Sequence, residues 1–314
     1  MHKPFTSIDD QISLLESRGV TCDNNTAMAL MREGYYSVVN GYKSPFIDKS
    51  ATAIAEDDRY LSGTKFDDIL CLFDFDRQLR LTMFKALTLA EAVLRTTCAY
   101  CFSQSHKDEP NAYLNKGNLF QPANDPYDTV NDLIAKMERI IKNGGREPNK
   151  GGKGYLHHCV TDHDGEVPLW VLANDMTIGQ ITTFYKIMGP AERGAVAHQF
   201  ELLYAKSHRK EKTITSAKLD SIYSRIKNFR NICAHDERLY CARPFGLNNS
   251  FFQLLKDLQL VLTKQQHLEL LQHVESLMMK IRKKLPDHET QILEAMGIKN
   301  SEAYSAYMEA IREN

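Results

Sequence analysis

The stretch "FDDILCLFDFDRQLRLTMFKALTLAEAVLRTTCAYCF", residues 66–102, decides the fold of this chain. Apolar residues recur along it at spacings of three or four, and neither proline nor glycine interrupts the pattern as far as about Ser105. Such spacing places the apolar side chains on one face of an amphipathic helix. The sequence therefore predicts one long central helix, whose apolar positions are Ile69, Leu72, Phe73, Leu79, Met83, Leu87, Val93 and Leu94.

Shorter helical patterns lie on both sides of this segment, and strand patterns are nearly absent, so we expect an all-α fold. Residues 34–46 combine tyrosine, valine, glycine and proline, which predicts an ordered loop and leaves one short strand open. Residues 106–127 form a long connection, and glycine-rich residues 142–158 are expected to be the most flexible stretch. Helices are predicted at about 7–18, 25–32 and 127–142, near Leu169, Ile178, Ala191 and Ser216, and at about 250–262, 264–284 and 301–312.

Composition narrows the functional classes. The formal net charge is -1 and the sequence pI is near 6.8, so a polyanionic partner must be held by local basic patches. No run of about 18 apolar residues predicts a membrane span, and the first residues have no apolar signal-peptide core. Seven cysteines are scattered without a disulfide framework, which favours a reducing cytoplasmic setting.

The stretch "SRIKNFRNICAHDERLY", residues 224–240, places unusual polar groups at the end of a predicted helix. On an ideal helix Arg230 lies at the edge of the apolar face, and Asn231 and His235 share the polar side. Arg230 and His235 are then roughly 140° apart. They converge only if the helix ends or distorts near Ala234, or if a second copy supplies the partner residue in a two-fold dimer. The structural alternative is a salt-bridged arginine and a histidine that caps the helix.

Six motifs, met in a fixed order over nearly the whole chain, resemble those of one family. The last, "RNICAHDERLY", is similar to the Arg–x4–His signature of HEPN ribonucleases. Together they resemble the Abi-like phage-defence proteins of the AbiD and AbiF type, and the AbiF type most. The five preceding motifs are "QISLLESRGV" (11–20), "YYSVVNGYKSPF" (35–46), "FDDILCLFDFDRQLR" (66–80), "EAVLR" (91–95) and "VPLWVLANDMTIGQI" (167–181).

This resemblance implies one Abi-like domain over residues 1–314. It would comprise an N-terminal helical and loop extension (1–65), a HEPN-like helical core (66–284) and a C-terminal helical tail (285–314). The implied activity is an RNase that acts as an abortive-infection toxin, restrained by a small structured non-coding RNA. The resemblance also extends to the HEPN nuclease portion of type VI CRISPR effectors.

HEPN nucleases cut RNA without a metal or other cofactor, and leave a 2′,3′-cyclic phosphate and a 5′-hydroxyl. The resemblance implies that His235 is the acid/base, Arg230 the phosphate stabiliser and Asn231 a positioning residue. Histidine suits proton transfer near neutral pH, and the planar guanidinium of arginine matches two phosphate oxygens. DNA lacks the 2′-hydroxyl group and should not be cut.

Charged residues near these positions are candidates for support of the cleft. Glu91 and Arg95 lie four apart on the long helix, where they form either an i,i+4 ion pair or a polar wall of the cleft. Asp236 and Arg238 follow His235 directly and either tune it or cap the turn. For Arg77 and Arg80 a structural role is favoured, because Asp74 and Asp76 can neutralise them.

Two basic runs are candidate RNA contacts, with an ordinary solvated loop as the alternative for each. The candidate cations are Lys142, Arg146, Lys150 and Lys153 in the first run, and Lys206, Arg209, Lys210 and Lys212 in the second. The first run lies in the glycine-rich stretch, where Tyr155 is available to stack on a base.

Three other features have structural interpretations. The histidine-rich stretch "HHCVTDH" (157–163) matches no standard zinc spacing. We expect Trp170 to anchor the core and Cys98 and Cys101 to be a buried pair.

Two other functions remain open. One is a HEPN dimer that binds a structured RNA without cutting it. The other is a toxin in which a tyrosine near the histidine, here Tyr240, is nucleotidylated by a partner enzyme.

Overall fold

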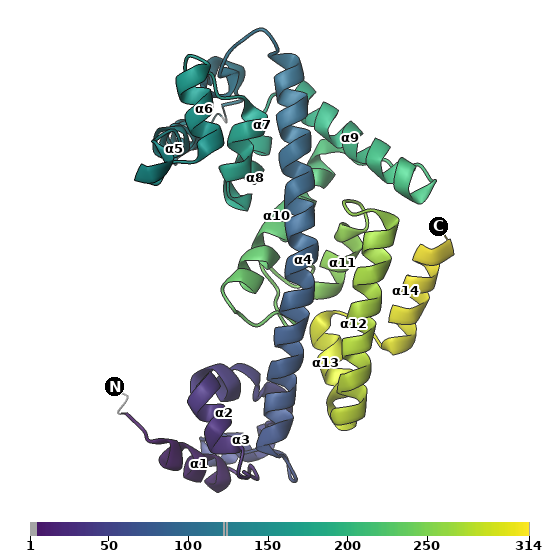
Figure 1. Ribbon diagram of the computed structural model, residues 1–314. Helices are drawn as coiled ribbons and strands as arrows, with labels where there is room; N and C mark the ends of the chain where they lie inside the picture. Colours follow the sequence, from purple (N-terminus) through teal and green to yellow (C-terminus); the bar gives the residue numbers. More distant parts are fainter. Residues whose placement is uncertain (1–4, 122, 124, 314) are drawn as a thin grey trace. The chain divides into compact units, whose positions relative to one another are not determined.

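The computed structural model describes residues 5–121, 123 and 125–313, and within them the fold is all-α, as predicted. Two isolated bridges, Thr21 with Lys65 and Ile47 with Tyr60, are the β pairings of this part of the chain. The helices are α1 (Ile8–Ser17), α2 (Thr26–Glu33), α3 (Lys49–Ala55), α4 (Phe66–Ser105), α5 (Thr129–Gly144), α6 (Gly154–Asp162), α7 (Leu169–Leu172), α8 (Ile178–Ile187), α9 (Pro190–His208), α10 (Ser216–Ala234), α11 (Phe251–Leu258), α12 (Lys264–Lys284), α13 (Glu289–Met296) and α14 (Ser301–Glu313) (Figure 1).

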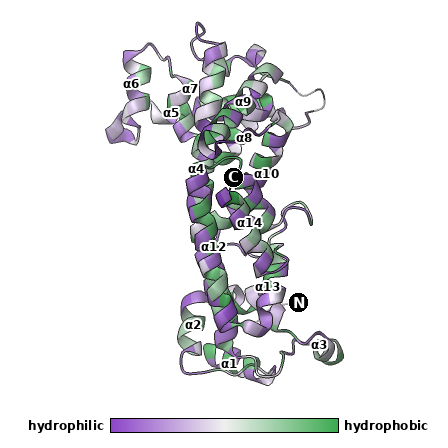
Figure 2. Cartoon of the chain, turned by 90° about the vertical axis from the view of Figure 1, so that its right-hand side faces the viewer, coloured by the Kyte–Doolittle hydropathy of each residue, from purple (hydrophilic) through white to green (hydrophobic). Residues whose placement is uncertain are grey.

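The long helix α4 has the predicted bounds and buries the predicted apolar face, with Val93 alone of the eight positions only partly covered. Hydrophilic and hydrophobic residues alternate along it in Figure 2. Asp67 and Asp68 lie in its first turn, where negative charge is favourable, and Asp68 accepts a hydrogen bond from Lys65 N. Cys98 and Cys101 are both buried on this helix, as predicted.

The packing divides the chain into two compact units. The first consists of residues up to Phe84 together with Ile232–Gln253 and Leu268–Glu313. The second consists of Lys85–Asn231 and Leu254–His267. The division therefore falls inside four helices, α4, α10, α11 and α12. The expected single domain, with divisions after residues 65 and 284, stays a prediction.

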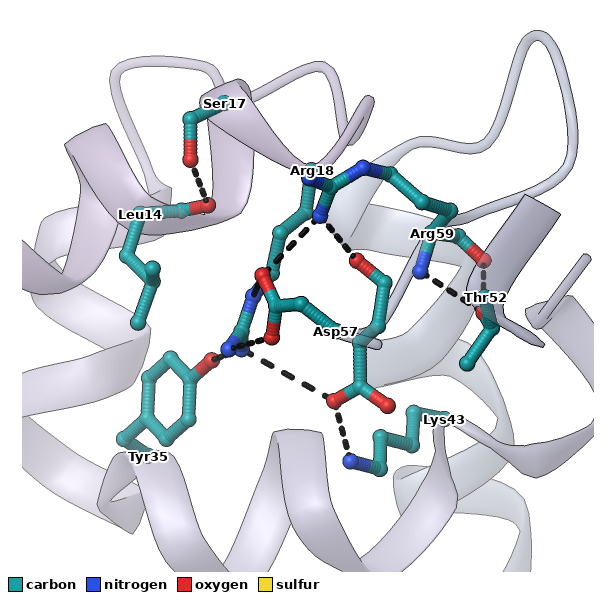
Figure 3. Close-up of polar contacts among 9 residues, drawn as sticks. Leu14, Ser17, Arg18, Tyr35, Lys43, Thr52, Asp57 and Arg59 are labelled. Atoms are coloured by element: carbon teal, nitrogen blue, oxygen red, sulfur yellow. Dashed lines mark hydrogen bonds and ion pairs between the residues drawn. The ribbon is translucent and has the colours of Figure 1, made fainter. Parts of the chain in front are cut away.

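An ion-pair cluster ties α1 to the segment that precedes α4 (Figure 3). Arg18 lies 2.5 Å from Asp57 and 3.7 Å from Asp58, and Asp58 also pairs with Lys43. The guanidinium groups of Arg18 and Arg59 lower the pKa of Asp57 to about 2. The N-terminal helices of the first unit are therefore held partly by charge.

Residues 34–46 contain no strand, which corrects the option left open for them. Tyr36–Asn40 form one π-helical turn and Ser44–Phe46 a 3₁₀ turn. The physical reason is that Val38 and Val39, adjacent in sequence, are both buried, whereas the side chains of a strand alternate between two faces. Tyr36 is 78% exposed, whereas Tyr42 and Phe46 of the same loop are buried.

The glycine-rich stretch forms defined structure in the second unit. A 3₁₀ turn covers Pro148–Lys150, and α6 begins at Gly154. Only glycine fits at position 152, because the Cβ atom of any other residue would lie 1.7 Å from the backbone oxygen of Arg146. Close backbone contact, rather than chain flexibility, explains this glycine.

Trp170 is not a core anchor, because 60% of it is exposed. The helix α7 has only one turn, and Leu169 and Leu172, three residues apart, occupy its buried face. A one-turn helix buries a single face, so the intervening tryptophan side chain points outward.

Candidate functional site

The apolar face of α10 places the motif residues at the protein surface. Leu219, Ile222, Ile226 and Phe229 are buried at the predicted spacing, while Cys233 is partly covered. The buried stripe therefore runs out as the helix approaches its C-terminus. The residues that follow it, 234–238, are all exposed.

The helix α10 ends at Ala234, which meets one of the two conditions under which Arg230 and His235 could converge; their convergence stays a prediction. Asp236 has a positive φ of 56°, and Glu237 N donates to Ile232 O at 3.1 Å. This is the hydrogen-bond pattern of a Schellman C-terminus, with aspartate in the left-handed position usually taken by glycine. His235 is the C-cap residue, so the helical repeat does not set the direction of its exposed side chain.

A buried carboxylate holds the chain just beyond this turn. Asp76, from α4, accepts hydrogen bonds from Leu239 N at 3.0 Å and from Tyr240 N at 2.7 Å. The Tyr42 hydroxyl and Arg80 Nη1 also donate to it, each at 2.7 Å. Burial raises the pKa of Asp76, while these donors stabilise its charged form. The segment after His235 is thus fixed to α4 by two backbone hydrogen bonds to one carboxyl group, which Tyr42 and Arg80 hold in place.

Arg80 connects the same carboxylate to the exposed turn. The buried Arg80 places Nη2 2.5 Å from Asp236 Oδ1. Its neighbour Arg77 pairs with Glu33 and lies 3.8 Å from Asp74. Both arginines therefore have the structural environment that the sequence favoured, although Glu33 and Asp236 were not foreseen as partners.

Arg238, the last exposed residue of the turn, contacts a different segment of the first unit. Its Nη1 donates to Gly41 O at 2.9 Å. The turn that carries His235 is accordingly held through Asp236 on one side and through Arg238 on the other.

Arg230 lies in the second unit, where a shared carboxylate engages it. Glu91 Oε2 lies 3.4 Å from Arg230 Nε, and Glu91 Oε1 accepts a hydrogen bond from Arg95 Nη2 at 2.9 Å. Glu91 is largely buried, so it is a fixed anchor for both guanidinium groups. The predicted i,i+4 ion pair is formed, and the same glutamate also reaches the motif arginine. Asn231, on the next position of α10, is exposed.

The first basic run is partly neutralised by acidic neighbours. Lys153 pairs with Asp175, to which the Tyr155 hydroxyl also donates at 2.7 Å. Lys150 lies 3.0 Å from Glu147. Lys142 and Arg146 remain exposed cations of this run.

The second basic run begins at the C-terminal end of α9. Arg209 takes a left-handed conformation with φ of 54° and ends the helix, and the four cations of this run are exposed. Figure 1 shows α5 and α6 on one side of the second unit and the end of α9 on the other. The two runs are therefore separate surface patches.

The histidine-rich helix α6 shows no convergence on a metal. His157 Nδ1 lies 2.9 Å from Gly145 O, and His158 Nδ1 lies 2.5 Å from Asp162. Across the described part of the chain, no group of three or more His, Cys, Asp or Glu side chains is arranged to hold a metal ion.

Two features of this region lay beyond sequence reasoning. Asp76 was noted only as a neutralising neighbour, because nothing local indicates that it binds a backbone 163 residues away. Tyr240 is buried with a hydroxyl pKa raised by burial, which makes it a poor acceptor for a modifying enzyme.

Comparisons with known proteins give one positive finding. A family model described as "Abi-like protein" matches residues 28–241, which is more than half of the chain. No curated protein matches, and no solved structure matches. Among the described residues, no helix has both the length and the apolarity needed to cross a bilayer.

Proposed function

Since the chain belongs to the Abi-like protein family, we propose that it is a metal-independent endoribonuclease that acts in abortive infection as a restrained toxin. The observation that carries the proposal is the exposed His235 at the C-cap of α10, in a turn whose following residues are hydrogen-bonded to buried Asp76. An accessible imidazole on an anchored backbone is what proton transfer to or from a bound substrate requires.

RNA cleavage through the ribose 2′-hydroxyl needs a base, an acid and a positive charge. The 2′-oxygen loses its proton and attacks the adjacent phosphorus, the bond from phosphorus to the 5′-oxygen breaks, and the leaving 5′-oxygen gains a proton. His235 either takes the first proton or supplies the second. Arg230 stabilises the charge that develops on the phosphate oxygens, and Asn231 positions the phosphate. The products are a 2′,3′-cyclic phosphate and a 5′-hydroxyl, with no metal in the scheme.

Glu91 supports the arginine in this scheme. Its largely buried carboxylate lies 3.4 Å from Arg230 Nε, so it restricts the rotamers of the arginine before substrate arrives. Because one of the two Glu91 oxygens also binds Arg95, the anchor itself is held in place.

The restraining partner is proposed to be a small structured RNA. The exposed cations in the two basic patches favour phosphate contacts at two separate surfaces, as a folded RNA would require. Because a single HEPN motif carries one histidine, we further propose a two-fold homodimer in which both copies contribute to a composite site. The exposed cations proposed to contact the RNA are Lys142, Arg146, Lys206, Arg209 and Lys212.

A second candidate, an RNA-binding dimer that does not cut, is favoured by one observation. The contact between Arg230 and Glu91 already neutralises part of the charge that a phosphate would use. A substrate must compete with that carboxylate, and a purely binding protein need not.

The test compares wild type with His235→Ala. Both proteins are purified from cells, the RNA that co-purifies is sequenced, and each is incubated with labelled RNA in EDTA. We expect one discrete RNA in both preparations and cleavage by wild type alone, with a cyclic phosphate at the new 3′ end. The matched control is His273→Ala, an exposed histidine on α12 that should cut as wild type does.

Three outcomes contradict the proposal. Full cleavage by His235→Ala removes the assignment of that residue. Cleavage that requires a divalent metal removes the mechanism. A discrete bound RNA that neither protein cuts, even after the bound RNA is stripped off, favours the RNA-binding dimer.

A further inference from the structure

A groove of about 490 Å³ lies beside the turn that carries His235, wholly within the first unit. Tyr36 and Asn40 line one wall, Glu237 and Arg238 line the other, and Tyr42 is among the remaining lining residues. Cavities of this size commonly accommodate small ligands, and a single nucleotide is within that range. None of the chemistry assigned to His235 explains the aromatic part of this groove.

The groove is lined by one exposed tyrosine ring and by a buried aromatic pair. Tyr36 is 78% exposed, although tyrosine usually buries its ring and leaves only the hydroxyl in water. Tyr42 and Phe73, which also lines the groove, are both buried and pack edge to face at 5.4 Å between ring centroids. An exposed ring beside a rigid aromatic pair is a stacking platform for a nucleic-acid base.

The rim of the groove suits the edge of a base better than a phosphate. Asn40 offers an amide with both a donor and an acceptor, and Glu237 offers an acceptor; both residues are exposed. Asp236 is engaged by Arg80 and Arg238 by Gly41 O, so both are already positioned. Carboxylates repel phosphate but accept hydrogen bonds from the amino and imino groups of bases.

The Tyr36 wall has an unusual backbone that is fixed in place. Tyr36–Asn40 form the π-helical turn, and Val38 and Val39 of that turn are buried. Single π-helical turns are frequent at functional sites. Here the turn buries its two valines and leaves Tyr36, Ser37 and Asn40 facing solvent.

We propose that this groove binds one unpaired base of an RNA strand, stacked on Tyr36 and hydrogen-bonded at its edge by Asn40 and Glu237. The inference rests on the proposed function, since it makes the groove the base subsite next to the phosphodiester that His235 acts on. Because Asp236, Glu237 and Arg238 directly follow His235, a base held between the walls brings its own sugar near that residue. The groove therefore selects single-stranded or flipped-out nucleotides.

The experiment measures binding without cleavage. The full chain carrying His235→Ala is mixed in EDTA with a short, mixed-sequence single-stranded RNA. Affinity is measured by fluorescence anisotropy, and the contact is located by ultraviolet cross-linking and mass spectrometry. We expect the cross-link on the peptide that contains Tyr36, and a loss of affinity of about 10-fold for Tyr36→Leu.

Two further variants separate stacking from other effects. Tyr36→Phe keeps the ring and should retain nearly all of the affinity. Tyr127→Leu, at a tyrosine 84% exposed in the second unit, should bind as the parent protein does. A Tyr36→Leu variant that binds and cross-links as its parent does, or a cross-link confined to other peptides, overturns the groove proposal.

Cleavage is scored separately in the wild-type background. If RNA cross-links at Tyr36 and the wild type cuts no RNA, the nuclease proposal fails and the base groove stands. If wild type cuts and Tyr36→Leu binds and cuts at the same sites and rate, the groove proposal fails alone.

Discussion

Asp76 and Tyr240 are joined by a 2.7 Å hydrogen bond from the tyrosine backbone N–H to the aspartate carboxylate. The two residues are 164 positions apart in sequence, and the contact fixes the chain five residues beyond His235. The position of the candidate histidine thus depends on a residue of the long helix, and this dependence can be measured.

Asp76→Asn should destabilise the first unit by about 3–5 kcal/mol, because it removes the buried carboxylate that pairs with Arg80 and leaves that arginine only the exposed Asp236 as an ion-pair partner among the described residues. The asparagine amide nitrogen also cannot accept the hydrogen bond of a backbone N–H. Chemical denaturation measures the change. Asp74→Asn, at an exposed position on the same helix, is the control and should cost less than about 1 kcal/mol. Equal stability of wild type and Asp76→Asn contradicts the anchoring role.

Glu91→Gln should lower RNA cleavage by about 10- to 100-fold, because Arg230 loses the carboxylate that orients it. Single-turnover cleavage and the thermal midpoint are measured together, so that a loss of folding is recognised. Glu138→Gln, an exposed glutamate of α5, is the matched control. A variant that cuts faster than wild type would show that Glu91 restrains Arg230 rather than preparing it.

Stability should fall in mild acid because His267 is buried in its neutral form. Burial lowers its pKa to about 4, below the value of about 6.5 in an unfolded chain. Its contribution is therefore complete above pH about 6.5 and is lost as the pH falls toward 4; at pH 5 the loss is about 2 kcal/mol.

His267→Gln removes this titration, so its free energy of unfolding should change less between pH 7.5 and pH 5 than that of wild type. His273→Gln, exposed on the same helix, should keep the wild-type slope. Identical slopes for wild type and His267→Gln would contradict a neutral buried imidazole.

Trp170 is the single tryptophan of the chain, and its exposed position predicts a red-shifted fluorescence that small quenchers reach. Asp108, Glu109 and Glu166 line the same surface cavity and outnumber Lys107, so caesium should quench more, and iodide less, than each ion quenches free tryptophan. Emission typical of a buried indole, unaffected by either ion, would contradict this placement.

The spacing of apolar residues predicted most of the helices. The buried face of a helix repeats every three or four residues, and this repeat does not depend on distant parts of the chain. The bounds of α4 and the apolar stripe of α10 follow from that rule. The helices α3, α6 and α13 were missed, and the first two lie in alanine- and glycine-containing stretches where the apolar repeat is weak. The candidate residues Arg230, Asn231 and His235 were identified from sequence, since a short motif is itself local.

Tertiary structure alone decided how those residues are supported and which other side chains are exposed or paired. Trp170 is a hydrophobic residue, but it is exposed because Leu169 and Leu172 occupy the buried face of α7. Lys153 is basic by type, but Asp175, 22 positions away, neutralises it. Asp76 reaches the backbone beyond His235 because folding brings distant segments together, and a contact of that range leaves no periodic trace in the sequence.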